Sequence, residues 1–226
     1  RAANGVVVVE TKAPEMGELR VSYHFSGDFN FADLSDYNLM NASEKLEYEQ
    51  LAGLYSHPNI GMKEELQEAY NERLKLVQQG VNTDWMKKPI HALGFSHKHS
   101  LLLARLRYGL DLNYQNKTGI MKGSGRQNIG IGIKLQYRYK NLRFMNNLTY
   151  DHVKQKDSPY GTFSDYTYMN PYLYPYDENG HIKQVLKIGD GEEYALNPLY
   201  NASLGTKFET TYQNFIDNFS VEWDVL

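Results

Sequence analysis

The sequence predicts an all-β fold with a helical loop insertion, in which about six antiparallel strands form part of a larger transmembrane β-barrel. Three observations predict this fold class. Apolar and polar residues alternate with a period of two over several stretches, which is typical of strands with one apolar face. Some stretches exceed about ten residues, which suits a strand tilted across a bilayer. Short and long connections also alternate along the chain, as in outer-membrane barrels.

The composition excludes several classes of protein. A net charge of −3 over 226 residues gives no electrostatic basis for binding nucleic acid. The absence of cysteine excludes disulfides and thiolate metal sites. The valine run at residues 6–9 is too short for a transmembrane helix. Because the chain begins at Arg1 and ends within a strand pattern, we interpret it as a piece of a longer protein.

The first third of the chain contains strand signals followed by helix signals. Residues 1–12 contain Gly5 and four valines, which predicts a strand that is apolar on both faces. Residues 18–29 alternate between apolar and polar side chains and predict the first barrel strand. Two helices follow. They are expected at residues 41–54, which open with a capping-box pattern, and at 62–79, which end before a glycine.

The clearest strand pair covers residues 127–152. Apolar side chains occupy odd positions up to Tyr139 and even positions from Leu142 onward. A two-residue turn at residues 140–141 explains this change of phase, because the two flanking residues then face each other and share one side of the sheet. We expect that side to contact lipid and Lys134 to face the lumen.

The same change of phase occurs once more, earlier in the chain. It predicts a second tight turn at residues 104–105, between Leu103 and Leu106. Glycine, asparagine and lysine mark residues 116–125 as a loop, and the final strand is expected at residues 215–226.

Several segments resemble, in the same order, the SusC-like (SusC/RagA) family of TonB-dependent outer-membrane transporters. Residues 1–12 (RAANGVVVVETK) resemble the closing strand of that family's plug domain. Residues 36–53 (DYNLMNASEKLEYEQLAG) and 82–100 (NTDWMKKPIHALGFSHKHS) resemble its first extracellular loop and its second strand. Residues 169–180 (MNPYLYPYDENG) and 197–200 (NPLY) resemble a large extracellular loop, so the resemblance covers essentially the whole chain.

The resemblance implies an organisation and a function. Residues 1–16 would be the last plug strand with a linker, and residues 17–226 would begin the barrel. The implied function is TonB-dependent import of a bulky nutrient across the outer membrane of a Gram-negative, Bacteroidetes-like bacterium, usually an oligosaccharide and sometimes a peptide. The implied partners are a SusD-like surface lipoprotein and, through a region before Arg1, the TonB complex. The alternative is a surface receptor that binds glycan or peptide without transporting it. Extracellular loops are expected at about residues 30–93, 116–125 and 156–207.

The lengths of the loops predict which rim of the barrel faces outward. Connections after the second and fourth strands are two residues long, and such short turns belong to the periplasmic rim. Aromatic residues of the apolar face gather near both rims, as in membrane-interface girdles. These are Tyr108, Tyr139 and Trp223 at the periplasmic rim, and Phe25, Tyr114 and Tyr150 at the outer rim. A soluble β-sandwich is the alternative; it explains the alternation but not the strand lengths or the loop asymmetry.

Six tyrosines in the longest predicted outer loop are the candidate ligand-binding residues. Flat aromatic faces can stack on sugar rings, while neighbouring asparagine and aspartate side chains supply hydrogen bonds. The alternative is that the tyrosines pack the loop against itself, a neighbouring loop or a partner protein. The six residues are Tyr160, Tyr166, Tyr168, Tyr172, Tyr174 and Tyr176.

Other motifs in the sequence carry little chemistry. His97 and His99 share one face of a strand, but no third metal ligand is evident. The acidic pairs at residues 177–178 and 192–193 lie beside glycines, where carboxylates are common turn formers. No residue pattern positions an acid against a base or a nucleophile. We therefore predict no catalytic residue, no metal site and no cofactor.

Overall fold

Six long strands form one open antiparallel sheet in the computed structural model, which describes residues 18–105, 107–188 and 193–225. Each strand pairs with its neighbour along the chain, which confirms the predicted fold class. The strands are β1 (Arg20–Asn30), β2 (Gly94–Arg105), β3 (Tyr108–Thr118), β4 (Gly125–Tyr139), β5 (Leu142–Lys156) and β8 (Glu209–Trp223). The predicted plug strand within residues 1–16 lies outside the described residues.

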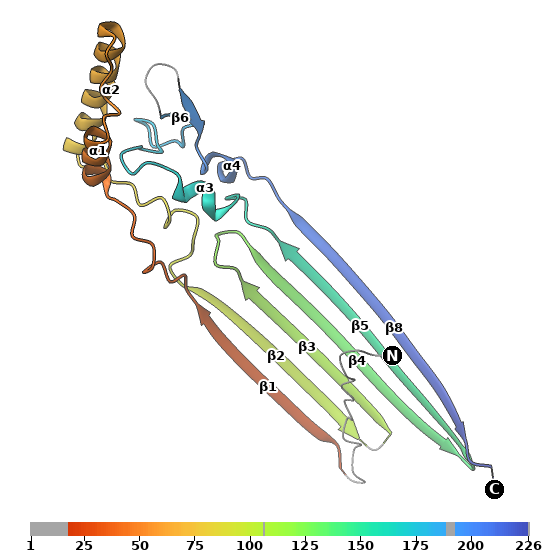
Figure 1. Ribbon diagram of the computed structural model, residues 1–226. Coiled ribbons are helices and arrows are strands. Elements are labelled where there is room, and N and C mark those ends of the chain that lie inside the picture. Colours follow the sequence, from red (N-terminus) through yellow and green to blue (C-terminus); the bar gives the residue numbers. More distant parts are fainter. Residues whose placement is uncertain (1–17, 106, 189–192, 226) are drawn as a thin grey trace, which may run out of the picture.

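The helices and the long connections gather at one end of the sheet, and the tight turns lie at the other end (Figure 1). The connection from β1 to β2 carries α1 (Ala42–Leu51) and α2 (Ile60–Gln78). The connection from β5 to β8 carries α3 (Phe163–Thr167), β6 (Val185–Lys187), β7 (Tyr194–Leu196) and α4 (Tyr200–Ser203). Across the described residues, no helix combines the length and the apolar character that a membrane span requires.

Local sequence signals set the ends of these elements. The predicted capping box is present at α1: Asn41 Oδ1 accepts from the Glu44 backbone N–H at 3.0 Å, and Glu44 Oε2 accepts from the Asn41 N–H at 2.9 Å. Gly80 adopts a left-handed φ of 83° just after α2, as its position predicts. The predicted turn between β4 and β5 is also confirmed, because Tyr139 pairs with Leu142 and Lys140 has a φ of 52°.

The tight turn predicted at residues 104–105 is wrong by two residues. Arg105 pairs with Tyr108, so residues 106–107 connect β2 to β3. Leu103 pairs with Leu110 rather than with a residue three positions away. The reason is that side chains alternate with a period of two, so a shift of two residues leaves each of them on its predicted face. The pattern therefore fixed the faces of the two strands but not the position of their turn.

Two loop boundaries also differ from the prediction. The loop expected at 116–125 is shorter, because β3 continues to Thr118 and β4 already begins at Gly125. The last strand begins at Glu209 rather than at residue 215, directly after the long loop. In both places polar residues extend the strands at the end that carries the loops, where an apolar pattern gives no signal.

Burial divides the molecule into two regions. Residues paired across the sheet share a face, and one row of such pairs joins Val21, Leu103, Leu110, Ile133 and Leu148. Nothing in the described part of the chain covers this apolar face with a second sheet, so the β-sandwich alternative is not formed. The buried hydrophobic residues lie instead in the loop region: Ala42, Leu46, Tyr55, Ala69, Trp85, Met86, Ile90, Tyr166, Tyr172, Leu173, Leu186 and Leu199.

Candidate functional site

The two long connections pack together into one layer, which we call the loop layer (residues 31–93 and 157–208). Trp85 Nε1 donates to the Asn170 carbonyl at 2.9 Å, and the Thr83 N–H donates to the Pro171 carbonyl at 2.7 Å. Segments far apart in the sequence therefore share one core, and this core positions the candidate tyrosines. Its buried members are Ala42, Trp85, Tyr166, Tyr172, Leu173, Leu186 and Leu199.

Tyr166 lies inside this core rather than on its surface. It is fully buried, and its hydroxyl donates to the carbonyls of Tyr160 at 2.9 Å and Pro198 at 3.0 Å. Burial, followed by the electrostatic effects of Tyr160 and then of Asp165, raises the pKa of Tyr166. The side chain ties α3 to the start of α4, and no ring face is open to a ligand.

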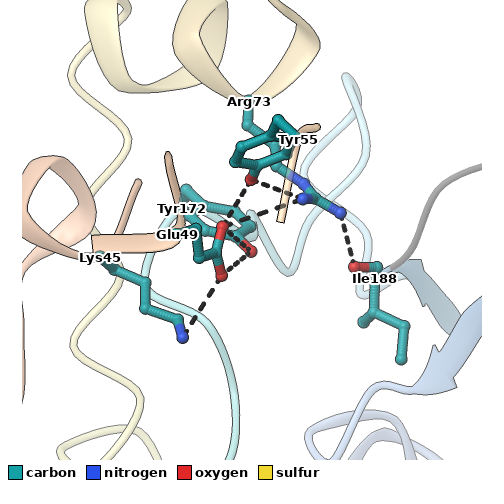
Figure 2. Close-up of polar contacts among 6 residues, drawn as sticks. All are labelled: Lys45, Glu49, Tyr55, Arg73, Tyr172 and Ile188. Carbon is teal, nitrogen blue, oxygen red and sulfur yellow. Dashed lines mark hydrogen bonds and ion pairs between the residues drawn. The ribbon is translucent and has the colours of Figure 1, made fainter. Parts of the chain in front are cut away.

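Tyr172 is buried as well, in a polar network around Glu49 (Figure 2). Its hydroxyl donates to Glu49 Oε1 at 3.0 Å, and the Tyr55 hydroxyl donates to Oε2 at 2.5 Å. Lys45 Nζ lies 3.3 Å from the same carboxylate, which is itself almost fully buried. A carboxylate on α1 thus anchors a residue 123 positions further along the chain.

Arg73 of α2 completes this network (Figure 2). Its guanidinium donates to the Tyr55 hydroxyl at 2.6 Å and to the Ile188 carbonyl at 2.8 Å, and it lies 3.8 Å from Glu49 Oε2. Burial lowers the pKa of Arg73, but the hydrogen bond to Tyr55 and the charges around it outweigh burial and raise the pKa overall. Arg73 therefore stays charged beside the Glu49 side chain, and its contacts join both helices to the far loop.

The other four candidate tyrosines keep accessible surface. Tyr168 is 84% exposed, and Tyr160 is half-buried with its ring centroid 6.0 Å from Lys122 Nζ. Tyr174 and Tyr176 meet edge to face, with centroids 5.6 Å apart. The structure thus brings two of the six together on the surface and buries two others. Ligand binding by any of the six stays a prediction.

Two open cavities in the loop layer are lined by candidate tyrosines. One, of about 600 Å³, lies between the segment that precedes α1 and the segment that follows α3, and Tyr37, Trp85 and Tyr168 contribute to its wall. The other, of about 1090 Å³, lies beside the end of α2, with Tyr174 and Tyr176 in its wall. Both volumes lie within or slightly above the range of small-molecule sites, so either could receive part of a larger ligand.

The remaining sequence candidates that the structure describes have structural contacts. The rings of His97 and His99 lie 5.2 Å apart on the apolar face, and His99 Nδ1 is 2.6 Å from the Tyr23 hydroxyl. No group of three or more potential metal ligands occurs within the described ranges. Asp177 forms a turn, because its carboxylate accepts from the backbone of Asn179 and His181. Glu192 lies outside the described residues.

Sequence reasoning missed the residues that hold the loop layer together. Arg73 stands in the second predicted helix, whose charged residues at i and i+4 spacing indicate a solvated face, and Glu49 stands in the first. Their burial depends on the second loop, which lies more than a hundred residues away in the sequence. Two of the lysines that line the larger cavity, Lys88 and Lys122, come from separate loops, and no sequence pattern identified them either.

Comparison with known proteins finds similarity at the level of structure. No family model and no curated protein matches the chain. Among solved structures, the RagAB peptide importer in the "closed-closed" state has a chain that matches this one with a TM-score of 0.73 at 17% identity. That match covers 100% of this chain and 28% of the other.

Two further solved structures give the same result. The structure of the RagAB peptide transporter matches with a TM-score of 0.68 at 17% identity, over 96% of this chain and 28% of that chain. The "open-open" state of the importer matches with a TM-score of 0.59 at 18% identity, over 97% of this chain and 28% of that chain. The chain therefore spans about a quarter of the length of each matched chain, and it shares the fold of that part.

Proposed function

We propose that this chain forms the first part of the barrel of a SusC/RagA-like TonB-dependent transporter in the outer membrane of a Gram-negative, Bacteroidetes-like bacterium. One observation carries this proposal: the described sheet exposes a largely apolar face, interrupted by the hydrogen-bonded pair Asn146 and Asp217 of β5 and β8, while the loops at one of its ends have a buried core of their own. A sheet face of this kind is stable in a bilayer, and a self-contained loop layer is stable in water.

The arrangement of aromatic residues supports the same placement. Phe29 and Phe95 pair at the loop end of β1 and β2, and Phe25, His99 and Tyr114 form another row across β1, β2 and β3, nearer the middle of these strands. Tyr139 and Trp223 lie at the opposite end of the sheet, where both of them pair with Leu142. Aromatic side chains at both ends of an apolar band are typical of the two interfaces of a membrane. The loop layer would then lie outside the cell.

The proposed activity is energy-dependent import of a bulky nutrient. A SusD-like lipoprotein would cover the loop layer, and TonB would act through a plug region that precedes the barrel. An oligosaccharide is the substrate that the family resemblance implies, and the accessible tyrosines suit stacking on sugar rings. A peptide gains support from the fold shared with chains of the RagAB peptide importer. A receptor that binds without transporting is the second candidate, and no covalent chemistry belongs to either function.

Deleting most of the larger loop tests the transport function. In the full-length protein, replacing residues 158–206 by a short Gly/Ser linker should leave heat-modifiable barrel assembly intact. The strain should lose growth on whichever peptide or glycan carbon sources the wild-type protein supports. Unchanged growth with normal assembly would rule out a role for this loop in import. If the wild-type protein binds a peptide or glycan but supports no growth on it, the receptor function is favoured.

A further inference from the structure

The larger cavity of the loop layer has a wall rich in lysine. It opens between the end of α2, the segment at residues 82–88 and the segment at residues 174–183. Four lysines from three separate stretches of chain line it, together with the edge-to-face pair of Tyr174 and Tyr176. The lysines are Lys87, Lys88, Lys122 and Lys183.

Two of these lysines, Lys88 and Lys122, are half-buried, and the side chain of Lys122 contacts the backbone of Lys88. Lys122 Nζ donates to the Lys88 backbone carbonyl at 2.7 Å, and the Lys88 ammonium lies 5.4 Å from the centroid of the Tyr176 ring. Among the residues that the structure describes, neither ammonium pairs with a carboxylate. Partly buried cations are costly without a counter-ion, because burial removes part of their hydration. The contacts that they do make, with the rings of Tyr176 and Tyr160 and with a carbonyl, do not neutralise their charges.

Two of the three acidic residues of the same wall already have partners. Asp84 pairs with Lys87 at 2.7 Å, at a more exposed position. Asp177 accepts backbone N–H groups from His181 at 2.7 Å and Asn179 at 2.9 Å, and the bond from His181 is the main cause that lowers its pKa. Glu178 is exposed. The described wall therefore carries four lysines against three carboxylates, a small excess of positive charge, although the chain as a whole has a net charge of −3.

We propose that this cavity is a subsite for a carboxylate of an acidic oligopeptide, bound by Lys88 and Lys122 against the ring of Tyr176. The assignment rests on the proposed transport function and narrows its substrate class. A glutamate or aspartate side chain, or a peptide C-terminus, presents its carboxylate on a narrow arm that can reach half-buried ammonium groups. A uronic acid carries its carboxylate directly on the ring, so the whole ring would have to enter beside Tyr176. Charge-assisted hydrogen bonds from two ammonium groups give such a contact both strength and direction.

Binding of a labelled glutamate-rich oligopeptide to the purified full-length protein tests this subsite. Lys88→Gln and Lys122→Gln should each raise Kd about tenfold, the equivalent of losing one charge-assisted hydrogen bond. Lys88→Arg keeps the charge and the contact with Tyr176, so it should retain most of the affinity. Lys63→Gln removes one charge from the exposed start of α2, far along the helix from the cavity, and should leave Kd unchanged.

Three outcomes would overturn the assignment. They are an unchanged Kd for both glutamine variants, equal binding of a peptide with glutamine in place of glutamate, and lysine-dependent binding of an oligogalacturonate but not of the peptide. Growth assays separate this result from the transport function. If neutral nutrients are imported while the lysine variants bind the acidic peptide normally, the subsite fails and transport stands. If the protein imports nothing yet binds the peptide through these lysines, transport fails and the subsite stands.

Discussion

The sheet and the loop layer differ in the exposure of their apolar side chains. In the sheet, large apolar residues such as Tyr137 and Phe219 remain more than half exposed, and they lie on the face that they share with their paired neighbours. In the loop layer, residues such as Trp85 and Tyr172 are almost completely buried. The apolar face of the sheet therefore needs an apolar environment outside the chain, whereas the apolar side chains of the loop layer are buried against one another.

The difference also concerns what holds each region together. The sheet depends on backbone hydrogen bonds in an unbroken register, from β1 to β8. The loop layer contains little regular pairing and depends on its core and on the network around Glu49. A substitution in one region should therefore leave the stability of the other region unchanged.

The largest expected effect follows from removing the carboxylate at the centre of the network. Glu49→Ala removes the carboxylate that lies 3.8 Å from the partly buried guanidinium of Arg73 and that accepts from the hydroxyls of Tyr55 and Tyr172. Breaking a buried pair in this way costs about 3–5 kcal/mol. In the full-length protein, hydrogen exchange should show that the free energy of opening of α1 and of the segment around Tyr172 falls by that amount.

A matched variant and the barrel itself are the controls for this change. Glu47→Ala removes an exposed carboxylate from the same helix and should leave exchange almost unaltered. Heat-modifiable mobility of the barrel should stay normal in both variants. Loss of barrel assembly in Glu49→Ala would mean that the two regions are not independent.

The second prediction places a charge on the apolar face of the sheet. Ile133 lies near the middle of β4, in the row that contains Leu110 and Leu148. Arginine on the lipid face near the bilayer midplane costs about 2–4 kcal/mol, so Ile133→Arg should reduce the fraction of protein assembled in the outer membrane.

Lys134→Gln is the control for this variant, because the next residue along the strand points to the opposite face. It should assemble as the wild type does. Equal assembly of Ile133→Arg and Lys134→Gln would contradict a lipid-facing apolar side. In both variants the loop layer, probed by proteolysis of assembled protein, should be unchanged.

The sequence predicted the sheet well because its information is local. Alternation from Val21 to Trp223 assigns each side chain to a face, and the change of phase at residues 140–141 locates a turn. The same rule failed by two residues at the β2–β3 turn, since a period of two cannot distinguish positions two residues apart. Polar strand ends, such as the first residues of β8, were missed for lack of apolar residues.

The candidate site could be predicted only in part. The six tyrosines identified the right loop, but burial decides the role of each, and burial depends on contacts between distant segments. Tyr172 is enclosed by Glu49 and Arg73 from the other loop, while Tyr174, two residues later, is exposed. In an irregular loop no periodicity links neighbouring residues to faces, so the sequence gives no means of separating them.

A third, smaller effect is expected from Tyr172→Phe. This change keeps the buried ring and removes only the hydroxyl that donates to Glu49. Because Tyr55 and Lys45 still contact the carboxylate, the cost should be about 0.5–1.5 kcal/mol in the free energy of opening of the loop layer. Hydrogen exchange of α1 measures it. A loss as large as that of Glu49→Ala would mean that the ring, rather than the carboxylate, is the centre of the network.

The smallest expected effect is a dependence of the loop layer on alkaline pH. Burial, followed by the hydrogen bond to Glu49, raises the pKa of Tyr55 to about 12, whereas an unfolded tyrosine titrates near pH 10. Since the folded pKa is the higher one, the stability that Tyr55 contributes is complete below about pH 10. It is lost as the pH rises towards about 12, because the open form ionises first. Protease sensitivity of the loops in assembled protein should therefore increase over this interval. Tyr55→Phe should reduce the increase but not abolish it, because burial also raises the pKa of Tyr166 and of Tyr172. If the heat-modifiable mobility of the barrel changes at a lower pH than the protease sensitivity of the loops, the sheet unfolds in alkali before the loop layer does.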